Sequence, residues 1–169
     1  MRPTLARWVE ITLEEPRWGE LGLKPLAKRA VKAVAAELGL GKQGISLLGC
    51  NDARIAVLNA QFRGKPTATN VLSWPATDLS PGTDGDAPNL PDAKSQLGDV
   101  AIAWETCEKE AADQQKTLQD HVLHLIVHAT LHLIGYDHQR KRDAARMEAL
   151  EKRILATLGV SDPYRDSAA

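Results

Sequence analysis

Hydrophobic and polar positions repeat with two different periods along the chain. Residues 8–13 alternate between apolar and polar side chains and are rich in β-branched types, which predicts a strand with one buried face. After Pro25, apolar residues recur at every third or fourth position as far as Leu38, which predicts a helix. Gly39 follows directly, and glycine is common just beyond the last residue of a helix.

The same criteria predict four strands and about five helices, and this mixture predicts an α+β fold with one small mixed β-sheet and helices packed on it. Strands are expected at 8–13, 44–49, 71–74 and 98–104. Helices are expected at 26–38, between a cap at Asn51 or Asp52 and a break at 64–66, and at about 105–114, 118–134 and 142–158. Residues expected to face inward in two of these helices are Ile55, Leu58, Phe62, Met147, Leu150, Ile154 and Leu158.

Residues 75–96 interrupt this regular pattern. Prolines and glycines lie there among polar residues, which predicts a long, mobile loop without regular structure. Such a loop is either a lid over a site or a simple insertion, and we favour the insertion. No internal repeat and no change of composition marks a domain boundary, so residues 1–169 are expected to form one domain.

Composition excludes membrane-spanning and secreted, disulfide-rich proteins. The 169 residues are 43% hydrophobic and 25% charged, which are ordinary values for a soluble globular domain. No apolar run approaches the roughly 18 residues of a membrane span, and the N-terminus lacks the apolar stretch of a signal peptide. Cys50 and Cys107 are far apart in the sequence, so we expect reduced core thiols in a cytoplasmic protein.

Charge is nearly balanced over the chain but uneven along it. The net charge is −1, whereas residues 1–70 carry 11 Lys and Arg against 6 Asp and Glu, which gives +5. A basic first segment can line a groove for a polyanion, but a solvated helix face is the simpler interpretation of these residues. Charge alone therefore does not identify a nucleic-acid-binding protein.

The strongest chemical signal is a group of histidines. All five histidines lie between positions 121 and 138, and His128, His132 and His138 follow the pattern H-x3-H-x5-H. On a helix, the first two share one face and lie about 6 Å apart along the axis, so both can reach one ion. Gly135 can end the helix in a left-handed conformation and turn the chain, which brings His138 back to the ion. This spacing predicts a metal site.

His121 and His124 compete with His138 for the third ligand position. His124 and His132 lie two turns apart, about 12 Å along the helix axis. Side chains on a helix all lean toward its N-terminus, so these two cannot converge on one ion. His138 is the better third ligand, and we expect His121 and His124 to pack, to support the ligands or to lie on the surface.

Three imidazole ligands are typical of a catalytic metal site, because they leave a fourth position open for water. We expect one zinc ion per chain, although imidazole also suits nickel, copper and iron. The spacing also matches the metzincin protease pattern H-E-x-x-H-x-x-G-x-x-H, but Ala129 stands where a protease needs its glutamate. Without that carboxylate, peptide cleavage loses its general base, which argues against a protease.

Other segments carry recognisable motifs besides the histidine string. They are Asn59-x-x-Phe62-Arg63-Gly64-Lys65, Thr69-Asn70-Val71-Leu72-Ser73-Trp74, Leu97-Gly98-Asp99-Val100-Ala101-Ile102 and Met147-Glu148-x-Leu150-Glu151. Together with residues 128–138, these motifs resemble the YbeY family of bacterial metal-dependent endoribonucleases, over residues 44–160. Ala129 in place of a glycine, Trp74 in place of a phenylalanine and the length of the loop at 75–96 depart from the family pattern.

The resemblance implies a function. It implies a metal-binding helix like that of metalloproteases, cleavage of single-stranded RNA, and a role in 16S rRNA 3′-end maturation and ribosome quality control. The implied partners are single-stranded RNA, the 16S rRNA precursor, and the small ribosomal subunit with its assembly factors. The family's catalytic arginine corresponds to Arg63, whose guanidinium can clamp two phosphate oxygens. From residue type alone, a salt bridge at a helix end is the preferred interpretation of Arg63.

The remaining candidate residues each have two interpretations. Asp137 either orients a ligand imidazole or caps the next turn, and Tyr136 either stacks on a base or packs in the core. Asn59 and Ser73 either contact phosphate or hold the arginine segment, and Lys65 is a candidate phosphate contact. Two other functions stay open, namely a metal-dependent hydrolase of another substrate and a non-catalytic ribosome-assembly factor with a structural metal.

Overall fold

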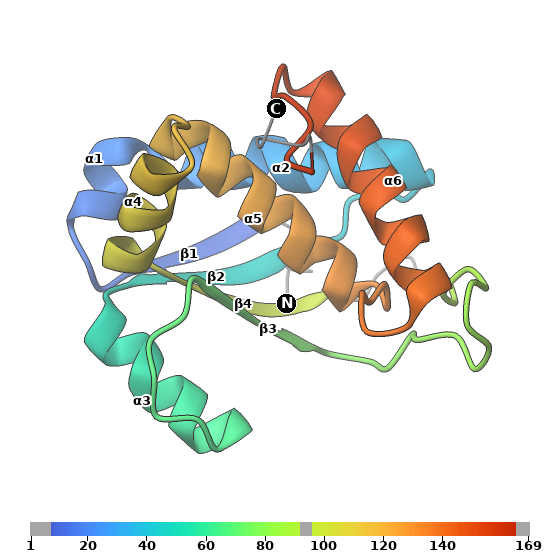
Figure 1. Cartoon of the computed structure of the whole chain (residues 1–169), viewed down its shortest axis with the longest axis horizontal. Coiled ribbons are helices and arrows are strands. Elements are labelled where there is room, and N and C mark those ends of the chain that lie inside the picture. Colours follow the sequence, from blue (N-terminus) through green and yellow to red (C-terminus); the bar gives the residue numbers. More distant parts are fainter. Residues whose placement is uncertain (1–7, 92–95, 165–169) are drawn as a thin grey trace, which may run out of the picture.

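A computed structural model of the chain describes residues 8–91 and 96–164 and contains four strands and six helices there (Figure 1). The strands are β1 (Val9–Leu13), β2 (Ile45–Cys50), β3 (Val71–Pro75) and β4 (Gly98–Ala103). The helices are α1 (Arg17–Leu21), α2 (Leu23–Leu38), α3 (Asp52–Arg63), α4 (Trp104–Asp113), α5 (Leu118–Leu133) and α6 (Lys141–Thr157). The predicted α+β class is confirmed.

The four strands form one mixed sheet in the order β1-β2-β4-β3. β1, β2 and β4 run parallel, whereas β3 runs antiparallel to β4 and lies at an edge. Leu47 of β2 pairs with Val100 of β4, and both side chains are buried. The predicted small mixed sheet is confirmed, and β3 is the edge strand that borders α5.

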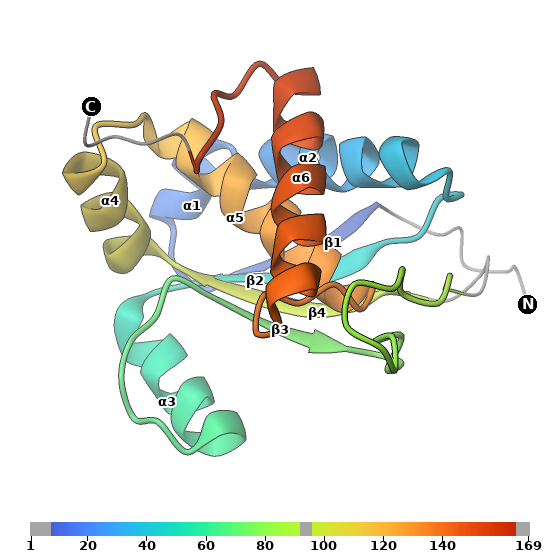
Figure 2. The same cartoon turned by 45° about the vertical axis from the view of Figure 1, so that its right-hand side comes forward.

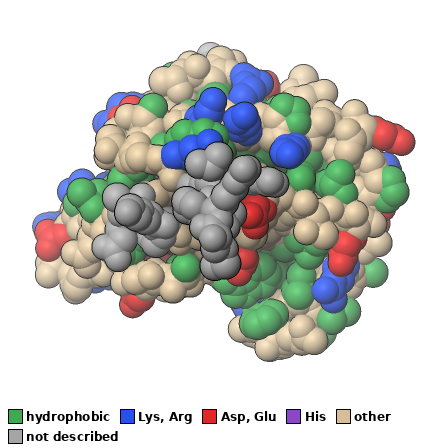
Figure 3. Space-filling view, turned by 180° about the vertical axis from the view of Figure 1, so that it is seen from behind, with side chains coloured by type: hydrophobic (Ala, Val, Ile, Leu, Met, Phe, Trp, Pro, Cys, Tyr) green, Lys and Arg blue, Asp and Glu red, His purple; other side chains and the backbone are tan. Residues whose placement is uncertain are grey.

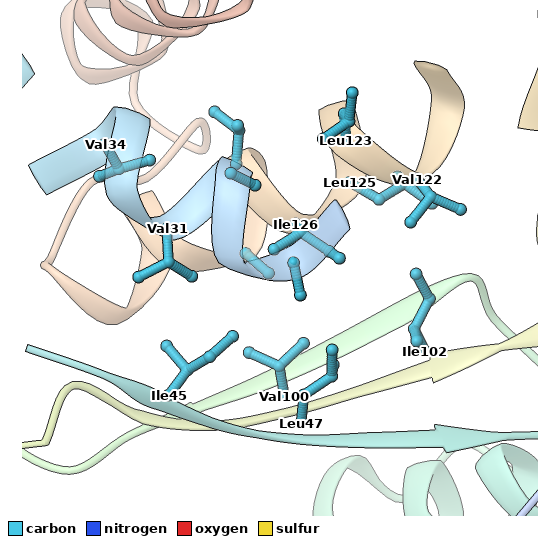
Figure 4. Close-up of a cluster of buried hydrophobic side chains, with 14 of the residues drawn as sticks. Val31, Val34, Ile45, Leu47, Val100, Ile102, Val122, Leu123, Leu125 and Ile126 are labelled. Carbon is cyan, nitrogen blue, oxygen red and sulfur yellow. The ribbon is translucent and has the colours of Figure 1, made fainter. Parts of the chain in front are cut away.

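The main core lies between the sheet and helices α2 and α5. Figure 4 shows Val31 of α2 and Ile126 of α5 pointing toward Ile45, Leu47 and Val100 of the sheet. Helices α4 and α6 also pack against α5, whereas α3 lies on the opposite face of the sheet (Figures 1 and 2). Helix α5 is therefore enclosed on most sides, which holds the side chains that it carries in defined positions.

The largest differences from the expected elements are one additional helix and two shifted boundaries. Helix α1 was not predicted, because its five residues are too few to show a period; Trp18 anchors it by donating its indole N–H to the Cys50 carbonyl at 2.9 Å. Helix α2 begins at Leu23, since Pro25 fits the first turn of a helix, where no backbone N–H is needed. Trp104 begins α4 and does not extend β4.

The expected inward position of Phe62 is wrong. Phe62 is 62% exposed and touches Trp74 edge-on, with ring centroids 5.3 Å apart, whereas Ile55 of the same helix is fully buried. The C-terminal turns of α3 project away from the sheet, so no second layer covers them (Figure 2). The expected reduced core thiols are present, because Cys50 and Cys107 are both buried and free.

The long loop between β3 and β4 contacts the start of α6. Asp143 accepts hydrogen bonds from the Gly85 backbone N–H at 2.8 Å and from the Arg140 side chain at 2.6 Å. Residues 76–91 contain no helix or strand, as predicted, while residues 92–95 of the predicted loop lie outside the described residues. The described part of the loop therefore has a defined position beside α6.

Among the described residues, none of the helices is both long enough and apolar enough to cross a membrane.

Candidate metal centre

Helix α5 carries two histidines on one face near its C-terminal end. Thr117 caps the start of the helix, since its hydroxyl accepts a hydrogen bond from the Asp120 backbone N–H at 3.1 Å. His128 and His132 lie one turn apart, with ring centroids separated by 4.6 Å. Their Nε2 atoms approach to 3.0 Å. The helical pairing expected from the sequence is therefore present.

A tight turn after α5 brings the third histidine to the other two. Gly135 has a φ of 104°, in the left-handed region, and a Cβ there would lie only 2.6 Å from the carbonyl carbon of Leu79. The ring centroid of His138 lies 5.3 Å from that of His128 and 5.1 Å from that of His132. Each of the three histidines has a ring nitrogen that lies within 4.8 Å of a ring nitrogen of the other two. The turn expected at this glycine is therefore present.

Hydrogen bonds indicate which nitrogen of His128 and of His132 is free. His132 Nδ1 lies 2.9 Å from the carbonyl oxygen of Tyr136, which can only accept, so this nitrogen carries the proton. His128 Nδ1 lies 2.7 Å from a carboxylate oxygen of Glu151 and donates in the same way. In neutral rings, the two Nε2 atoms are then unprotonated and their lone pairs face each other across 3.0 Å. Such a pair is stabilised by a proton shared between the two nitrogens or by a metal ion that both nitrogens bind.

Burial keeps His132 in the neutral form. It lowers the pKa of His132 to about 4, and repulsion from His128 and His138 acts in the same direction. Neutral imidazole is the form that binds metal ions. The three histidines could therefore hold a metal ion, and nitrogen donors of this kind suit zinc and other divalent transition metals.

The three histidines open into a cleft of about 610 Å³. Its walls come from α5 and the turn that follows it, from the edge strand β3, and from loop residues 77–80. Arg63, the last residue of α3, is exposed and also lines this cleft. Side chains from opposite faces of the sheet, a guanidinium and a cluster of imidazoles, therefore meet at one opening.

Three further candidates from the sequence line the same cleft, namely Ser73, Tyr136 and Asp137. Tyr136 is partly buried and packs against the main core, and its carbonyl oxygen accepts the hydrogen bond from His132. The side chain of Asp137 accepts a hydrogen bond from the backbone N–H of His138 at 2.7 Å. These contacts hold the turn that carries the third histidine.

Asn59 and Lys65 are not among the described residues that line the cleft. Asn59 is 4% exposed, and its side-chain amide donates to the Thr67 carbonyl oxygen at 2.9 Å. It therefore holds the turn after α3, next to the end of the helix that bears Arg63. Lys65 is exposed on this turn.

The two remaining histidines lie closer to the start of α5. His121 is buried, which lowers its pKa, and its Nε2 lies 2.9 Å from a carboxylate oxygen of Glu110. His124 Nε2 lies 3.0 Å from a carboxylate oxygen of Glu151. His124, His128 and Glu151 form a second group whose donor atoms lie within 4.8 Å of one another.

Two residues beside the histidines, Glu151 and Tyr164, were not predicted as site residues. Burial raises the pKa of Glu151, but hydrogen bonds from His124 and His128 outweigh burial and lower it to about 2. The Tyr164 hydroxyl donates to the same carboxylate at 2.5 Å. One signal for Glu151 was available, because it lies four residues after Met147, on the buried face of α6, where a carboxylate is rare.

Comparison with known proteins decides the family. The family model for endoribonuclease YbeY matches residues 12–159. The chain belongs to the endoribonuclease YbeY family. An endoribonuclease YbeY of Dinoroseobacter shibae is 56% identical over 162 residues, which cover 92% of this chain and 90% of the relative. Another, from a Jannaschia species, is 53% identical over 158 residues, which cover 92% of this chain and 99% of the relative.

Membership of the YbeY family confirms the endoribonuclease activity expected from the sequence motifs. The solution structure of the Thermotoga maritima protein TM1509 is also similar, with a TM-score of 0.55 and 22% identity. That similarity covers 93% of this chain and 99% of the other, and it supports the fold.

Proposed function

We propose that this member of the YbeY family is a single-strand-specific, metal-dependent endoribonuclease that matures the 3′ end of 16S rRNA in the cytoplasm. The observation that carries the proposal is the opening of the three histidines and Arg63 into one cleft. Its partners would be precursors of the small ribosomal subunit and the assembly factors bound to them. The shared name of the relatives, endoribonuclease YbeY, supports an RNA substrate.

We propose one zinc ion per chain, with His128, His132 and His138 as its ligands. When bound, such an ion would polarise a phosphoryl oxygen and lower the pKa of a water molecule. The protein keeps the Nε2 atoms of the first two ligands free, because Tyr136 and Glu151 accept their Nδ1 protons. His138 is exposed, so its side of the cluster stays open to the substrate.

Arg63 would bind the phosphate group at which the RNA is cleaved. Its guanidinium can donate two parallel hydrogen bonds to phosphate oxygens and offset the negative charge that develops during hydrolysis. Asn59 supports the turn beside it through the Thr67 carbonyl. Lys65 on this turn, and Ser73 on β3, would contact neighbouring phosphates.

Single-stranded RNA is the substrate that fits this arrangement best. An unpaired strand can bend until one phosphate reaches both Arg63 and the histidines, whereas a duplex holds its phosphates on a stiff surface. Tyr136 lines the cleft and offers a ring on which an unpaired base can stack. The 2′-hydroxyl is the group that distinguishes RNA from DNA at such a site.

The basic residues of α2 are separate from this cleft. Lys24, Lys28 and Lys32 are not among the described residues that line it. Figure 3, the view from behind, shows lysine and arginine side chains gathered in the upper part of that face, with no histidine side chain in view. RNA binding should therefore weaken only moderately with salt, because few phosphate contacts release counterions.

Cleavage assays run side by side test the proposed activity. The wild-type protein should cleave single-stranded RNA faster than duplex RNA or DNA of the same sequence at one salt concentration. His132→Ala should abolish cleavage while circular dichroism shows that the protein stays folded. A non-catalytic assembly factor would show no RNA cleavage that depends on His132. Equal rates on duplex and single strand, or cleavage of peptides without cleavage of RNA, would contradict the proposal.

Sequencing of 16S rRNA 3′ ends in depleted cells tests the maturation role. Unprocessed 3′ ends should accumulate and should disappear when the wild-type protein, but not His132→Ala, is supplied again. Normal 3′ ends after depletion would overturn the maturation role and leave the endoribonuclease activity intact.

A further inference from the structure

Glu151 is a fully buried carboxylate that RNA binding does not explain, because it has no exposed surface. One oxygen accepts a hydrogen bond from His128 Nδ1 at 2.7 Å. The other accepts from His124 Nε2 at 3.0 Å and from the Tyr164 hydroxyl at 2.5 Å. Donors from α5 and from the segment after α6 therefore converge on one carboxylate of α6, where this helix packs against α5 (Figures 1 and 2).

The buried residues of α6 next to Glu151 are apolar. Met147, Ile154 and Leu155 are all buried there. A buried carboxylate is unfavourable unless its oxygens are hydrogen-bonded, and an apolar residue would complete this face without that cost. Packing alone therefore does not explain a carboxylate at this position. The hydrogen bonds that Glu151 accepts do explain it.

A second metal ion is one alternative explanation, because the donor atoms of His124, His128 and Glu151 lie within 4.8 Å of one another. Each contact with Glu151 is already a complete hydrogen bond, since the carboxylate accepts and the ring nitrogen donates. Between His128 and His132, by contrast, both facing nitrogens are acceptors when the two rings are neutral. The geometry favours protons at Glu151 and a cation at the three histidines.

We infer that Glu151 is a positioning residue for the metal centre, an inference that rests on the proposed metal site. By accepting the Nδ1–H of His128, the carboxylate holds the ring so that Nε2 points into the cluster. Its negative charge also makes that nitrogen a stronger ligand. His124 and the Tyr164 hydroxyl occupy the second oxygen and so prevent the carboxylate from turning away from His128.

Tyr164 connects the C-terminal segment of the chain to this carboxylate. Its ring meets that of His124 edge-on, with centroids 5.9 Å apart, and it lines the cleft. Replacing Tyr164 by phenylalanine would remove one hydrogen bond to Glu151 and keep the ring contact. Tyr164→Phe therefore perturbs Glu151 less than a change of the carboxylate itself.

Metal affinity tests the inference without RNA. Glu151→Gln keeps the size of the side chain and removes its charge, and Glu148→Gln makes the same change three residues earlier on α6, at a partly exposed position. In competition with a chelator, Glu151→Gln should bind Zn²⁺ about 10- to 100-fold more weakly. Tyr164→Phe should lose at most about fivefold, and Glu148→Gln should stay within about twofold.

Cobalt provides a spectroscopic measurement of the same effect. With Co²⁺ in place of zinc, Glu151→Gln should shift the d–d absorption bands, because the His128 ligand changes its orientation and donor strength. Unchanged affinity and an unchanged spectrum in a folded Glu151→Gln protein would overturn the inference. Absence of zinc binding in the wild-type protein would instead overturn the metal site itself.

Nitrogen NMR of the wild-type protein applies even if Glu151→Gln does not fold. In the zinc-loaded protein, His128 should be protonated at Nδ1 and bound through Nε2, with an Nδ1 proton that exchanges slowly. Binding of His128 through Nδ1, or a second bound ion that His124→Ala removes, would overturn the inference.

Discussion

Arg63 and His132 bring opposite kinds of chemical group to one cleft. Arg63 is exposed and carries a positive charge, whereas burial lowers the pKa of His132 to about 4 and keeps its imidazole neutral. A guanidinium attracts phosphate, and a neutral imidazole binds a metal cation. At the scale of single residues, the cleft therefore combines a side chain that can bind phosphate with side chains that could hold a metal ion.

Arg63→Ala should reduce the rate of RNA cleavage at least about tenfold, the effect of losing one electrostatic contact in the transition state. Metal content and the unfolding midpoint should not change, because this side chain is exposed at the end of α3. Arg63→Lys should recover only part of the activity, since an ammonium cannot donate as a bidentate fork.

A matched control for Arg63 exists on the same helix. Arg54 pairs with Glu14 at 3.2 Å and is not among the described residues of the metal cleft. Arg54→Ala should therefore leave cleavage unchanged. Full turnover in Arg63→Ala would assign Arg63 to a structural role.

Single alanine variants should separate metal ligands from their neighbours. Elemental analysis should find one ion per chain in the wild-type protein and in His124→Ala, because His124 Nε2 faces Glu151 and not the cluster. His138→Ala should lose the ion and still fold, since His138 is exposed in the turn after α5. A full complement of metal in His138→Ala would show that another residue is the third ligand.

At the scale of elements, two segments far apart in the sequence contact each other near His138. Helix α5 ends at Leu133 and α6 begins at Lys141, and the turn between them carries Gly135. The long loop packs on this turn through Leu79, and Asp143 of α6 holds the loop farther along, at Gly85. The position of the turn therefore depends on the loop as well as on α5.

Gly135→Ala should destabilise the protein and weaken zinc binding together. An alanine at a φ of 104° is strained, and its methyl group would collide with the Leu79 backbone, so the turn and the loop must both move. Zinc affinity from chelator competition and unfolding free energy from urea titration measure the two effects.

Gly39→Ala is the control for backbone strain alone. Its φ of 68° is also left-handed, but nothing lies within 4 Å of the added Cβ. It should cost about 1–2 kcal/mol of unfolding free energy and leave zinc binding unchanged. Equal losses of unfolding free energy in Gly39→Ala and Gly135→Ala would mean that the contact between Gly135 and the loop does not contribute to stability.

At the scale of the whole molecule, folding buries polar groups of the site in a layer of helices. His132 belongs to α5 and Glu151 to α6, and both helices lie on the same side of the sheet (Figure 1). Their pKa values are lowered in the folded protein and return to ordinary values when the chain unfolds. The stability of the whole fold is therefore linked to pH through these two residues.

The metal-free protein should lose stability as the pH falls below about 6.5. Burial lowers the pKa of His132 from 6.5 to about 4, so between these values the unfolded chain binds more protons than the folded one. Burial raises the pKa of Glu151, but its hydrogen bonds lower it from 4.5 to about 2, so its stabilisation is complete above pH 4.5 and is lost toward pH 2. Urea unfolding at about pH 7.5, 5.5 and 4 measures this dependence, and a constant unfolding free energy from about pH 6.5 to 4 would contradict it.

Periodicity and helical spacing were enough to predict the elements that carry the site and the pairing of His128 with His132 on one helical face. The helix expected at 118–134 and the turn at Gly135 follow from periodicity and from the backbone preferences of single residues, which act over a few positions. His128 and His132 share a helical face in any fold, because they are four residues apart. Sequence motifs also predicted the YbeY family of endoribonucleases, and the family model and the similar proteins confirmed it.

Contacts between residues far apart in the sequence could not be predicted and depend on the packing of the whole fold. Glu151 reaches His128 because α6 packs against α5, and Tyr164 reaches Glu151 because the chain returns after α6. Phe62 looked buried by its period, yet no second layer covers the end of α3. Periodicity shows that one face of an element is apolar. What covers that face depends on contacts between residues far apart in the sequence. The same contacts decide which polar groups are buried in pairs.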